Sequence, residues 1–363
     1  MPHQRSLALC IAVLVVPAAL YAADKSKAIT SLADVDADFR IQGEYLGSIT
    51  TEHCRCQAVG LQVVAMGDGE FTAVEYDGGL PGYGWQVGGE RSKYSGRRDG
   101  DLVVLTGDKK KLEIRDGRAT ITTVGEYRRL GCANRVERES STMGACPPCD
   151  AVVLFDGTDT DSFRNGKKTE DGLLMEGTET RVGYGDMRLH LEFLLPYMPH
   201  ARGQGRANSG VYVQSRYEIQ ILDSFGQEGA FNECGALYRE RKPDLNMCLP
   251  PLTWQTYDIW FRGPRFGADA QKTENARFTV SLNGVPVQND VELASGTGAG
   301  KRIGEGPNPL PTKLQNHSNP VRFRNIWLVE TGPAKTQAMS PLAATGSRSP
   351  ETVAILRSIG YLK

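Results

Sequence analysis

Residues 211–222 read VYVQSRYEIQIL, and apolar and polar side chains alternate along most of this stretch. Successive side chains of a β-strand point to opposite faces of the sheet, so the stretch predicts one strand with an apolar face and a polar face. The apolar face carries Val211, Val213, Tyr217, Ile219 and Ile221. This face is expected to pack in a hydrophobic core.

The opposite face of the predicted strand is polar along its whole length. It carries Tyr212, Gln214, Arg216, Glu218 and Gln220. One interpretation is an ordinary solvated face, which is common in antiparallel sheets. The other is a carbohydrate-binding face, because aromatic, amide, carboxylate and guanidinium groups together can stack on sugar rings and bind their hydroxyls. The stretch alone does not decide between the two.

Similar alternating segments flank this stretch, with long loops and no predicted helix of ten residues between them. They lie at residues 187–195, 256–261, 277–282 and 321–329, and an Asn283-Gly284 turn follows the third. Many short strands separated by turn signals are typical of a β-sandwich. We therefore predict an all-β domain of this kind over residues 150–332.

Three of these segments also place polar side chains on one face. The sets are Arg188, His190 and Glu192, then Thr256, Asp258 and Trp260, then Arg322 and Arg324. A single concave surface explains these faces more economically than several independent solvated ones. We expect them to converge with the polar face of residues 211–222 in one carbohydrate cleft.

The N-terminal half shows the same pattern in shorter runs. Residues 38–130 alternate, and Asp68-Gly69 and Asp116-Gly117 are hairpin signals because the tight turns between twisted strands need positive φ. We predict a smaller antiparallel β-domain over residues 28–145 and a boundary near residues 145–150. For residues 333–363 we predict a Pro/Ser/Ala-rich tail with a short C-terminal helix.

The first 23 residues resemble a secretory signal peptide. Arg5 precedes an apolar run of 14 residues, 7–20, whereas a membrane-spanning helix needs about 20 residues. We expect cleavage near Ala22 or Ala23, a periplasmic or secreted protein, and no stable membrane anchor.

Charge and cysteine content narrow the functional classes further. The 42 Lys and Arg against 43 Asp and Glu give a net charge of −1, so no nucleic-acid partner is expected. Of eight cysteines, Cys10 lies in the signal segment, and the other seven would favour disulfides in an exported chain. An odd number leaves at least one thiol unpaired. We favour a Cys234–Cys248 pair.

Six separated motifs carry a resemblance to a known family. They are LFDG at 154–157, ARGQGRANSGVY at 201–212, YEIQILDS at 217–224, ECGA at 233–236, WQTYD at 254–258 and NPVRFRNI at 319–326. In this order they resemble the 3-keto-disaccharide hydrolase domain family over roughly residues 150–332. The resemblance implies a concanavalin-like jelly roll acting on glycosides or disaccharides oxidised at C3. Residues 38–45, DFRIQGEY, resemble a module found ahead of this domain in some members.

The implied substrate gives the polar residues a chemical role. A carbonyl at C3 acidifies the C2 proton, so a base can remove that proton, the aglycone can leave from C1, and water can add afterwards. Glu218 is our first choice for the base, with His190 and His317 as alternatives. Arg322 or Arg324 would stabilise the enolate.

Further residues are candidates for substrate binding or for a metal. The predicted substrate-binding residues are Asn208, Tyr212, Gln214, Arg216, Gln220, Asp223, Glu233, Trp254, Gln255, Asp258 and Arg324. A divalent metal ion could take ligands from Glu192, Glu218, Asp223, Glu233, Asp258, His190 and His317, but no compact spacing identifies a site. No other cofactor is predicted.

Two alternative functions are open at this point. Laminarinase-like retaining glycosidases carry E-x-D-x-x-E, whereas residues 218–223 here read EIQILD, with Gln in place of the central acid and Asp in place of the last. These replacements favour cleavage assisted by the keto group. A non-catalytic, lectin-like module is the other alternative, because jelly rolls also bind sugars without cleaving them.

Overall fold

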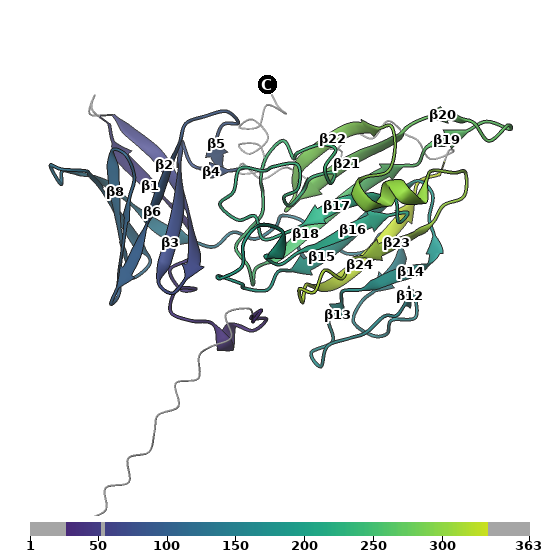
Figure 1. Ribbon diagram of the computed structural model, residues 1–363, viewed down its shortest axis with the longest axis horizontal. Helices are drawn as coiled ribbons and strands as arrows, with labels where there is room; N and C mark the ends of the chain where they lie inside the picture. Colours follow the sequence, from purple (N-terminus) through teal and green to yellow (C-terminus); the bar gives the residue numbers. More distant parts are fainter. Residues whose placement is uncertain (1–26, 52–54, 333–363) are drawn as a thin grey trace, which may run out of the picture.

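The computed structural model describes residues 27–51 and 55–332. The predicted signal peptide, Cys54 and the tail with its predicted helix lie outside the described residues. The described part consists almost entirely of β-strands in two bodies, drawn side by side in Figure 1. The predicted all-β class is confirmed.

The first body is a closed antiparallel barrel of eight strands in the order β1-β10-β9-β8-β7-β6-β3-β2. Its strands are β1 Gly43–Thr50, β2 Cys56–Gly67, β3 Glu70–Asp77, β6 Arg91–Asp99, β7 Leu102–Thr106, β8 Lys110–Arg115, β9 Arg118–Thr123 and β10 Arg129–Val136. Asp68-Gly69 and Asp116-Gly117 form the predicted tight turns, with positive φ at all four residues. The closure of the sheet was not predicted.

The second body is a β-sandwich. One sheet has seven strands: β11 Val152–Phe155, β13 Leu174–Met175, β15 Met187–Leu194, β18 Trp254–Arg262, β21 Ala276–Leu282, β22 Val285–Leu293 and β24 Arg322–Glu330. The other sheet has five: β12 Phe163–Arg164, β14 Thr178–Gly183, β16 Ser209–Val213, β17 Tyr217–Ile221 and β23 Pro311–Leu314. Apolar side chains of both sheets meet in one core cluster that includes Leu191, Phe193, Val211, Ile219 and Ile259.

Short elements complete the described chain. They are the strand pairs β4 Leu80–Pro81 with β5 Gly84–Trp85 and β19 Arg265–Phe266 with β20 Lys272–Glu274, and the 3-10 helices η1 Leu32–Asp34, η2 Gly203–Gly205 and η3 Gly298–Ile303. No helix among the described residues is both long and apolar enough to span a membrane.

The barrel and the sandwich share apolar surface. Val64, Val74, Tyr76 and Trp85 of the barrel half belong to the core cluster of the sandwich. In return, Tyr197 of the sandwich half is fully buried in the core cluster of the barrel. Because each body buries side chains of the other, the two are packed together rather than only tethered by a linker.

The structure corrects the prediction of one long strand over residues 211–222. The chain reverses at Gln214 and Ser215, whose φ values of 49° and 54° lie in the left-handed region, so the stretch is the β16–β17 hairpin. The turn was missed because neither residue is Gly, Asn or Asp, the usual residues at such positions. The hairpin pairs Tyr212 directly with Glu218.

The cysteines differ from the expectation as well. The six described cysteines are free thiols in the structure, and the predicted Cys234–Cys248 disulfide is not formed. The two thiols are nevertheless neighbours in the core, where a hydrogen bond to Cys248 and another to Tyr257 outweigh burial and lower the pKa of Cys234. Cys248 keeps its proton because burial raises its pKa.

Candidate active site

The predicted polar faces lie on opposite sides of the sandwich, so the expectation of one convergent cleft is wrong. Glu218 points outward from the five-stranded sheet, because its neighbour Ile219 faces the core. His190 points outward from the seven-stranded sheet, because Leu189 and Leu191 face the core. Alternation assigns each side chain to the inner or outer face of its own sheet, but it does not say which of the two sheets a strand joins.

Glu218 is held on the outer face by its hairpin partner. The Tyr212 hydroxyl donates a hydrogen bond of 2.7 Å to Glu218 Oε2. The carboxylate also lies against the backbone of Gly210, where a Cβ atom would be 2.6 Å from Glu218 Oε1. Glycine at position 210 therefore makes the room that the Glu218 side chain occupies.

The environment of Glu218 suits a general base near neutral pH. Burial raises the pKa of Glu218 to about 7, although the hydrogen bond from Tyr212 and the positive charges of Arg239 and Lys313 act in the opposite direction. Burial also raises the pKa of Tyr212, which therefore remains a proton donor. A carboxylate with this pKa can take up and release a proton under physiological conditions.

A group of amide side chains borders the carboxylate. One end of the Gln220 amide lies 3.2 Å from Glu218 Oε1, and the other end lies 3.0 Å from Gln204 Oε1. The Asn208 amide donates to the Gln204 carbonyl oxygen at 2.8 Å. On the other side, Gln315 Nε2 donates to the Tyr212 hydroxyl at 3.3 Å. These groups offer both donors and acceptors next to the carboxylate, as sugar hydroxyls require.

The loop that contains η3 closes the hairpin side of the site. The Glu218 backbone N–H donates to Thr297 Oγ1 at 2.6 Å, and the Thr297 N–H donates to the Arg216 carbonyl at 2.9 Å. Arg216 in turn donates to the Gly304 carbonyl at 2.7 Å and to Gln214 Oε1 at 3.1 Å. Arg216 and Gln214, predicted to bind substrate, thus hold this loop.

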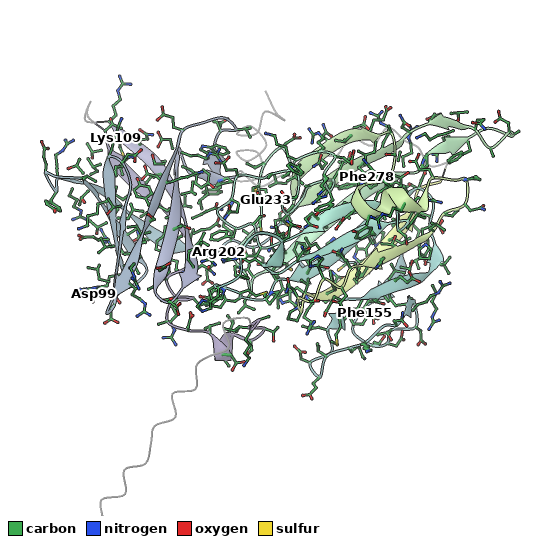
Figure 2. The ribbon with its side chains drawn as sticks, viewed as in Figure 1. Asp99, Lys109, Phe155, Arg202, Glu233 and Phe278 are labelled. Atoms are coloured by element: carbon green, nitrogen blue, oxygen red, sulfur yellow. The ribbon has the colours of Figure 1, made fainter. Side chains whose placement is uncertain are left out.

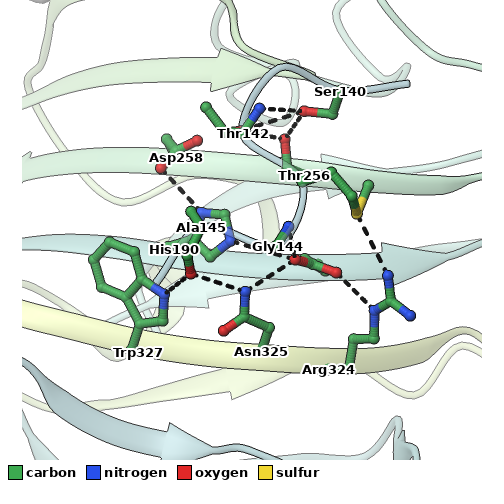
Figure 3. A network of polar contacts seen from close by, with 12 residues as sticks. Ser140, Thr142, Gly144, Ala145, His190, Thr256, Asp258, Arg324, Asn325 and Trp327 are labelled. Carbon is green, nitrogen blue, oxygen red and sulfur yellow. Dashed lines mark hydrogen bonds and ion pairs between the residues drawn. The ribbon is translucent and has the colours of Figure 1, made fainter. Parts of the chain in front are cut away.

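The outer face of the seven-stranded sheet carries a second polar cluster (Figure 3). His190 Nδ1 lies 3.1 Å from Asp258 Oδ1, and the imidazole stacks on Trp327 with 5.0 Å between ring centroids. Glu192 accepts hydrogen bonds from Arg324 Nε at 2.6 Å and Asn325 Nδ2 at 2.9 Å. His190 and Glu192 are almost completely buried.

The interdomain linker covers this second cluster. The Gly144 N–H donates to Glu192 Oε1 at 2.7 Å, and the Ala145 carbonyl accepts from Trp327 Nε1 at 3.1 Å. Ser140 and Thr142 contact the Thr256 hydroxyl at 2.6 and 2.7 Å. The cluster therefore anchors the linker to the sandwich, and the linker covers His190.

The charged groups of the second cluster stabilise one another's ionised forms. Burial opposes ionisation of Glu192, but the nearby His190, whose Nε2 lies 3.9 Å from Glu192 Oε1, and hydrogen bonds from Asn325 and Arg324 outweigh it and lower the pKa of Glu192 to about 2. Burial also opposes the imidazolium, yet Asp258 and Glu192 outweigh it and raise the pKa of His190. The arrangement is that of a buried ion network rather than of a free base.

The remaining predicted residues are held by partners other than Glu218 or are exposed. Asp223 forms an ion pair with Arg206 at 2.7 Å, and Arg322 forms one with Glu176 at 2.6 Å. Glu233 accepts hydrogen bonds from the Gly229 and Ala230 N–H groups, and Gln255 accepts one from the Leu249 N–H. His317 is exposed in the loop after β23. Arg324 stacks on Trp254, 3.9 Å from the ring centroid, and both line a cavity of about 460 Å³ between barrel and sandwich.

Of the predicted site, the structure therefore brings together Glu218, Tyr212, Gln220 and Asn208. It adds residues that the sequence reasoning missed: Gln204, Arg239, Thr297, Lys313 and Gln315. Lys313 could have been found from the sequence, because it occupies an outward position in a short alternating segment. In the structure this segment pairs with β16. Among residues 27–51 and 55–332, no group of three or more His, Cys, Asp or Glu side chains is arranged to hold a metal ion.

Comparison with known proteins identifies the sandwich. Residues 150–329 match the model of the 3-keto-α-glucoside-1,2-lyase-like domain. The sandwich domain belongs to this family. This match indicates that the sandwich is a carbohydrate-active domain of the hydrolase or lyase class.

Solved structures resemble the chain over part of its length. Two crystal structures of proteins provisionally named glycosyl hydrolases, from Parabacteroides distasonis ATCC 8503, each align with 50% of this chain. One has 30% identity, 84% of its own chain covered and a TM-score of 0.46. The other has 15% identity, 94% covered and a TM-score of 0.36. No curated protein matches the chain.

Proposed function

We propose that the sandwich cleaves 3-keto-glycosides or 3-keto-disaccharides, with Glu218 as the base that removes the C2 proton. The observation that carries this proposal is the buried Glu218 carboxylate, with a pKa of about 7, amid the amide and hydroxyl groups of Tyr212, Gln220 and Asn208. Family membership supplies the substrate class.

The proposed reaction is an elimination followed by a hydration. Glu218 accepts the C2 proton, and the electron pair of the C2–H bond moves into an enolate that the C3 carbonyl stabilises. The enolate then forms the C1–C2 double bond and expels the aglycone oxygen from C1, and this oxygen takes up a proton. Water finally adds its hydroxyl group to C1 and a proton to C2, which restores the 3-keto sugar without net oxidation or reduction.

The enolate needs positive charge or fixed donors near its oxygen. Arg322 and Arg324, our predicted candidates, lie on the outer face of the other sheet. The cations whose fields act on Glu218 are Lys313 and Arg239. Lys313 also lies over the Tyr212 ring, 6.0 Å from its centroid. We therefore transfer the electrophilic role to Lys313 and Arg239.

The retaining-glycosidase alternative requires a second carboxylate that works together with Glu218. Asp223 occupies the last acid position of that motif, but its side chain is fully buried in an ion pair with Arg206. A lectin-like module would use the same amides without a base. A raised pKa at the centre of the amide group favours the enzyme, because pure binding does not require a proton acceptor there.

The test compares purified protein on 3-keto-trehalose, 3-keto-sucrose and the unoxidised parents. We expect cleavage of the keto sugars only. Glu218→Gln should lower the rate by about 10² to 10⁴, the usual contribution of a general base. Glu228→Gln is the matched control, because Glu228 is an exposed glutamate paired with Lys93.

Three results would contradict the proposal. The first is equal cleavage of the unoxidised parents, and the second is full turnover by Glu218→Gln. The third is binding of keto sugars without cleavage and without exchange of the C2 hydrogen in deuterated water. That last result would identify the sandwich as a lectin-like module.

A further inference from the structure

The barrel touches the sandwich at the loop that leads into the candidate active site, residues 197–208. Arg202 of this loop donates to the Met66 carbonyl at the end of β2 at 2.7 Å, and Figure 2 shows Arg202 in the region between the two bodies. The two terminal nitrogens of Arg206 each lie 3.5 Å from the Ala65 carbonyl. The loop therefore rests on backbone atoms of the barrel.

The first residue of the same loop is anchored inside the barrel. Tyr197 is fully buried there, its ring packs edge-on against Phe39 at 5.0 Å, and its hydroxyl donates to Asp36 at 3.1 Å. Its backbone forms a β-bridge with Ile29. One end of the loop is thus fixed by residues that precede the first barrel strand.

The barrel surface beneath the loop leaves no spare room. Gly67, at the end of β2, has a φ of 85°, and a Cβ atom there would overlap the His200 imidazole of the loop. At Gly67 the barrel backbone therefore lies directly against the His200 side chain of the loop. A side chain at this position would have to displace the His200 imidazole of the loop.

The other end of the loop reaches Glu218. Arg206 Nε donates to Asp223 Oδ2 at 2.7 Å, and both side chains are almost fully buried. Gln204 contacts the Gln220 amide at 3.0 Å, and that amide extends to within 3.2 Å of Glu218 Oε1. A continuous path of contacts thus runs from Ala65 and Met66 of the barrel to the carboxylate.

The energetics make this path dependent on the barrel. A buried guanidinium is costly unless its donors find acceptors, and the Ala65 carbonyl supplies one that the sandwich does not. The loop itself is mostly without regular structure, with η2 as its one short element. Its conformation is therefore set by what it packs against.

We propose that the barrel is a positioning element of the active site, whose β2–β3 end holds the loop 197–208 so that Gln204 and Asn208 stay against Gln220 beside Glu218. This inference rests on the proposed function of Glu218. It gives the N-terminal body a role in the reaction through the loop that it holds.

The test uses two glycine variants in the barrel half at positions with the same φ. Gly67→Ala places a methyl group against His200, whereas Gly88→Ala places one in open space at the same φ of 85°. Two readouts are needed: kcat and KM on a 3-keto-glycoside, and the titration of Glu218 followed by NMR of ¹³C-labelled glutamate, with Glu218→Gln identifying its signal.

For Gly67→Ala we expect kcat/KM to fall at least about tenfold and the Glu218 titration to move to lower pH. The direction follows because burial is the main cause of the raised pKa, and a displaced loop admits water to the carboxylate. Gly88→Ala should match the wild type in both. If Gly67→Ala is folded and matches the wild type in both kcat/KM and the Glu218 titration, the proposal is overturned.

A second pair of variants covers the case in which Gly67→Ala does not fold. Arg202→Gln removes the hydrogen bond to Met66, and Lys93→Gln removes the exposed Lys93–Glu228 ion pair, another contact between barrel and sandwich. We expect the first variant alone to shift the titration. Identical titrations of the two variants overturn the proposal.

The NMR readout separates this inference from the proposed function. If wild-type protein cleaves no 3-keto-glycoside, the proposed function fails. A displaced Glu218 titration in Gly67→Ala and Arg202→Gln would still show that the barrel controls the surroundings of Glu218. The opposite result is a wild type that cleaves 3-keto-glycosides while the Glu218 titration is the same in all variants. That result would support the proposed function and overturn the role of the barrel.

Discussion

Tyr212 and Glu218 face each other across the β16–β17 hairpin, and the Tyr212 hydroxyl donates to Glu218 Oε2 at 2.7 Å. Cross-strand partners lie side by side on one face of a sheet, so the turn at Gln214 and Ser215 creates this contact. The contact matters chemically because it gives the buried Glu218 carboxylate one strong hydrogen-bond donor. Burial and the tyrosine then act on the carboxylate in opposite directions.

Replacing Tyr212 with Phe tests this balance. The hydrogen bond lowers the pKa of Glu218, so its loss should raise that pKa above the present value of about 7. Because the base must be deprotonated, the rise of kcat/KM with pH should move to higher pH by about one unit, as expected for a hydrogen bond to a charged group. Tyr127→Phe, at an exposed barrel position, is the control. A profile that stays in place or moves to lower pH would contradict this account.

Gly210 provides a second test of the geometry. A methyl group from Gly210→Ala would lie 2.6 Å from Glu218 Oε1, so the carboxylate must move. We expect a loss of activity of at least about tenfold, because small displacements of a catalytic group cost large factors in rate. The control is Gly185→Ala, where no heavy atom lies within 4 Å. Steady-state kinetics and thermal unfolding of both variants check the result, and full activity of Gly210→Ala would refute it.

The stability of the protein should also report the pKa of Glu218. Between about pH 4.5 and pH 7 the folded state keeps the Glu218 proton while the unfolded chain loses it, so this group makes the wild type less stable as pH rises through that window. Glu218→Gln has no such titration. Its melting temperature relative to the wild type should therefore increase by several degrees from pH 4.5 to pH 8. An unchanged difference in melting temperature would show that the carboxylate is not desolvated.

The particular residues show what the sequence could and could not predict. Alternation correctly placed Glu218 and Gln220 on one face and Ile219 on the other, because period two is a local property of a strand. It could not tell that β17 and β15 belong to different sheets, because pairing between strands far apart in sequence leaves no trace in the alternation. Hence Glu218 and His190 were expected in one cleft but face opposite directions.

The loops explain the other misses. Gln204 lies in a loop whose shape depends on contact with the barrel, and Thr297 lies in a loop held by Arg216. Neither contact has a local sequence pattern. The family motifs, in contrast, contain most of the candidate site, because residues 201–212 and 217–224 include Gln204, Asn208, Tyr212, Glu218 and Gln220.

The last prediction concerns His190, our alternative base. Its imidazole is buried under the linker, with Asp258 and Glu192 beside its two nitrogens and Arg188 and Arg324 paired to those carboxylates. Because the pKa of His190 is raised in the folded protein, its stabilising contribution is complete below pH 6.5 and is lost as pH rises through the folded value. His190→Gln should therefore lower the melting temperature more at pH 6 than at pH 9.

The same variant should keep the pH dependence of 3-keto-glycoside cleavage, because Glu218 lies on the other face of the sandwich. His317→Gln is the matched control for stability, since His317 is exposed in a loop and its loss should leave the melting temperature unchanged. Melting curves at pH 6 and pH 9 test the prediction on stability, and one pH–rate profile tests the prediction on cleavage. Loss of turnover in folded His190→Gln, with Glu218→Gln still active, would move the base to His190 and require the linker to lift from the sheet.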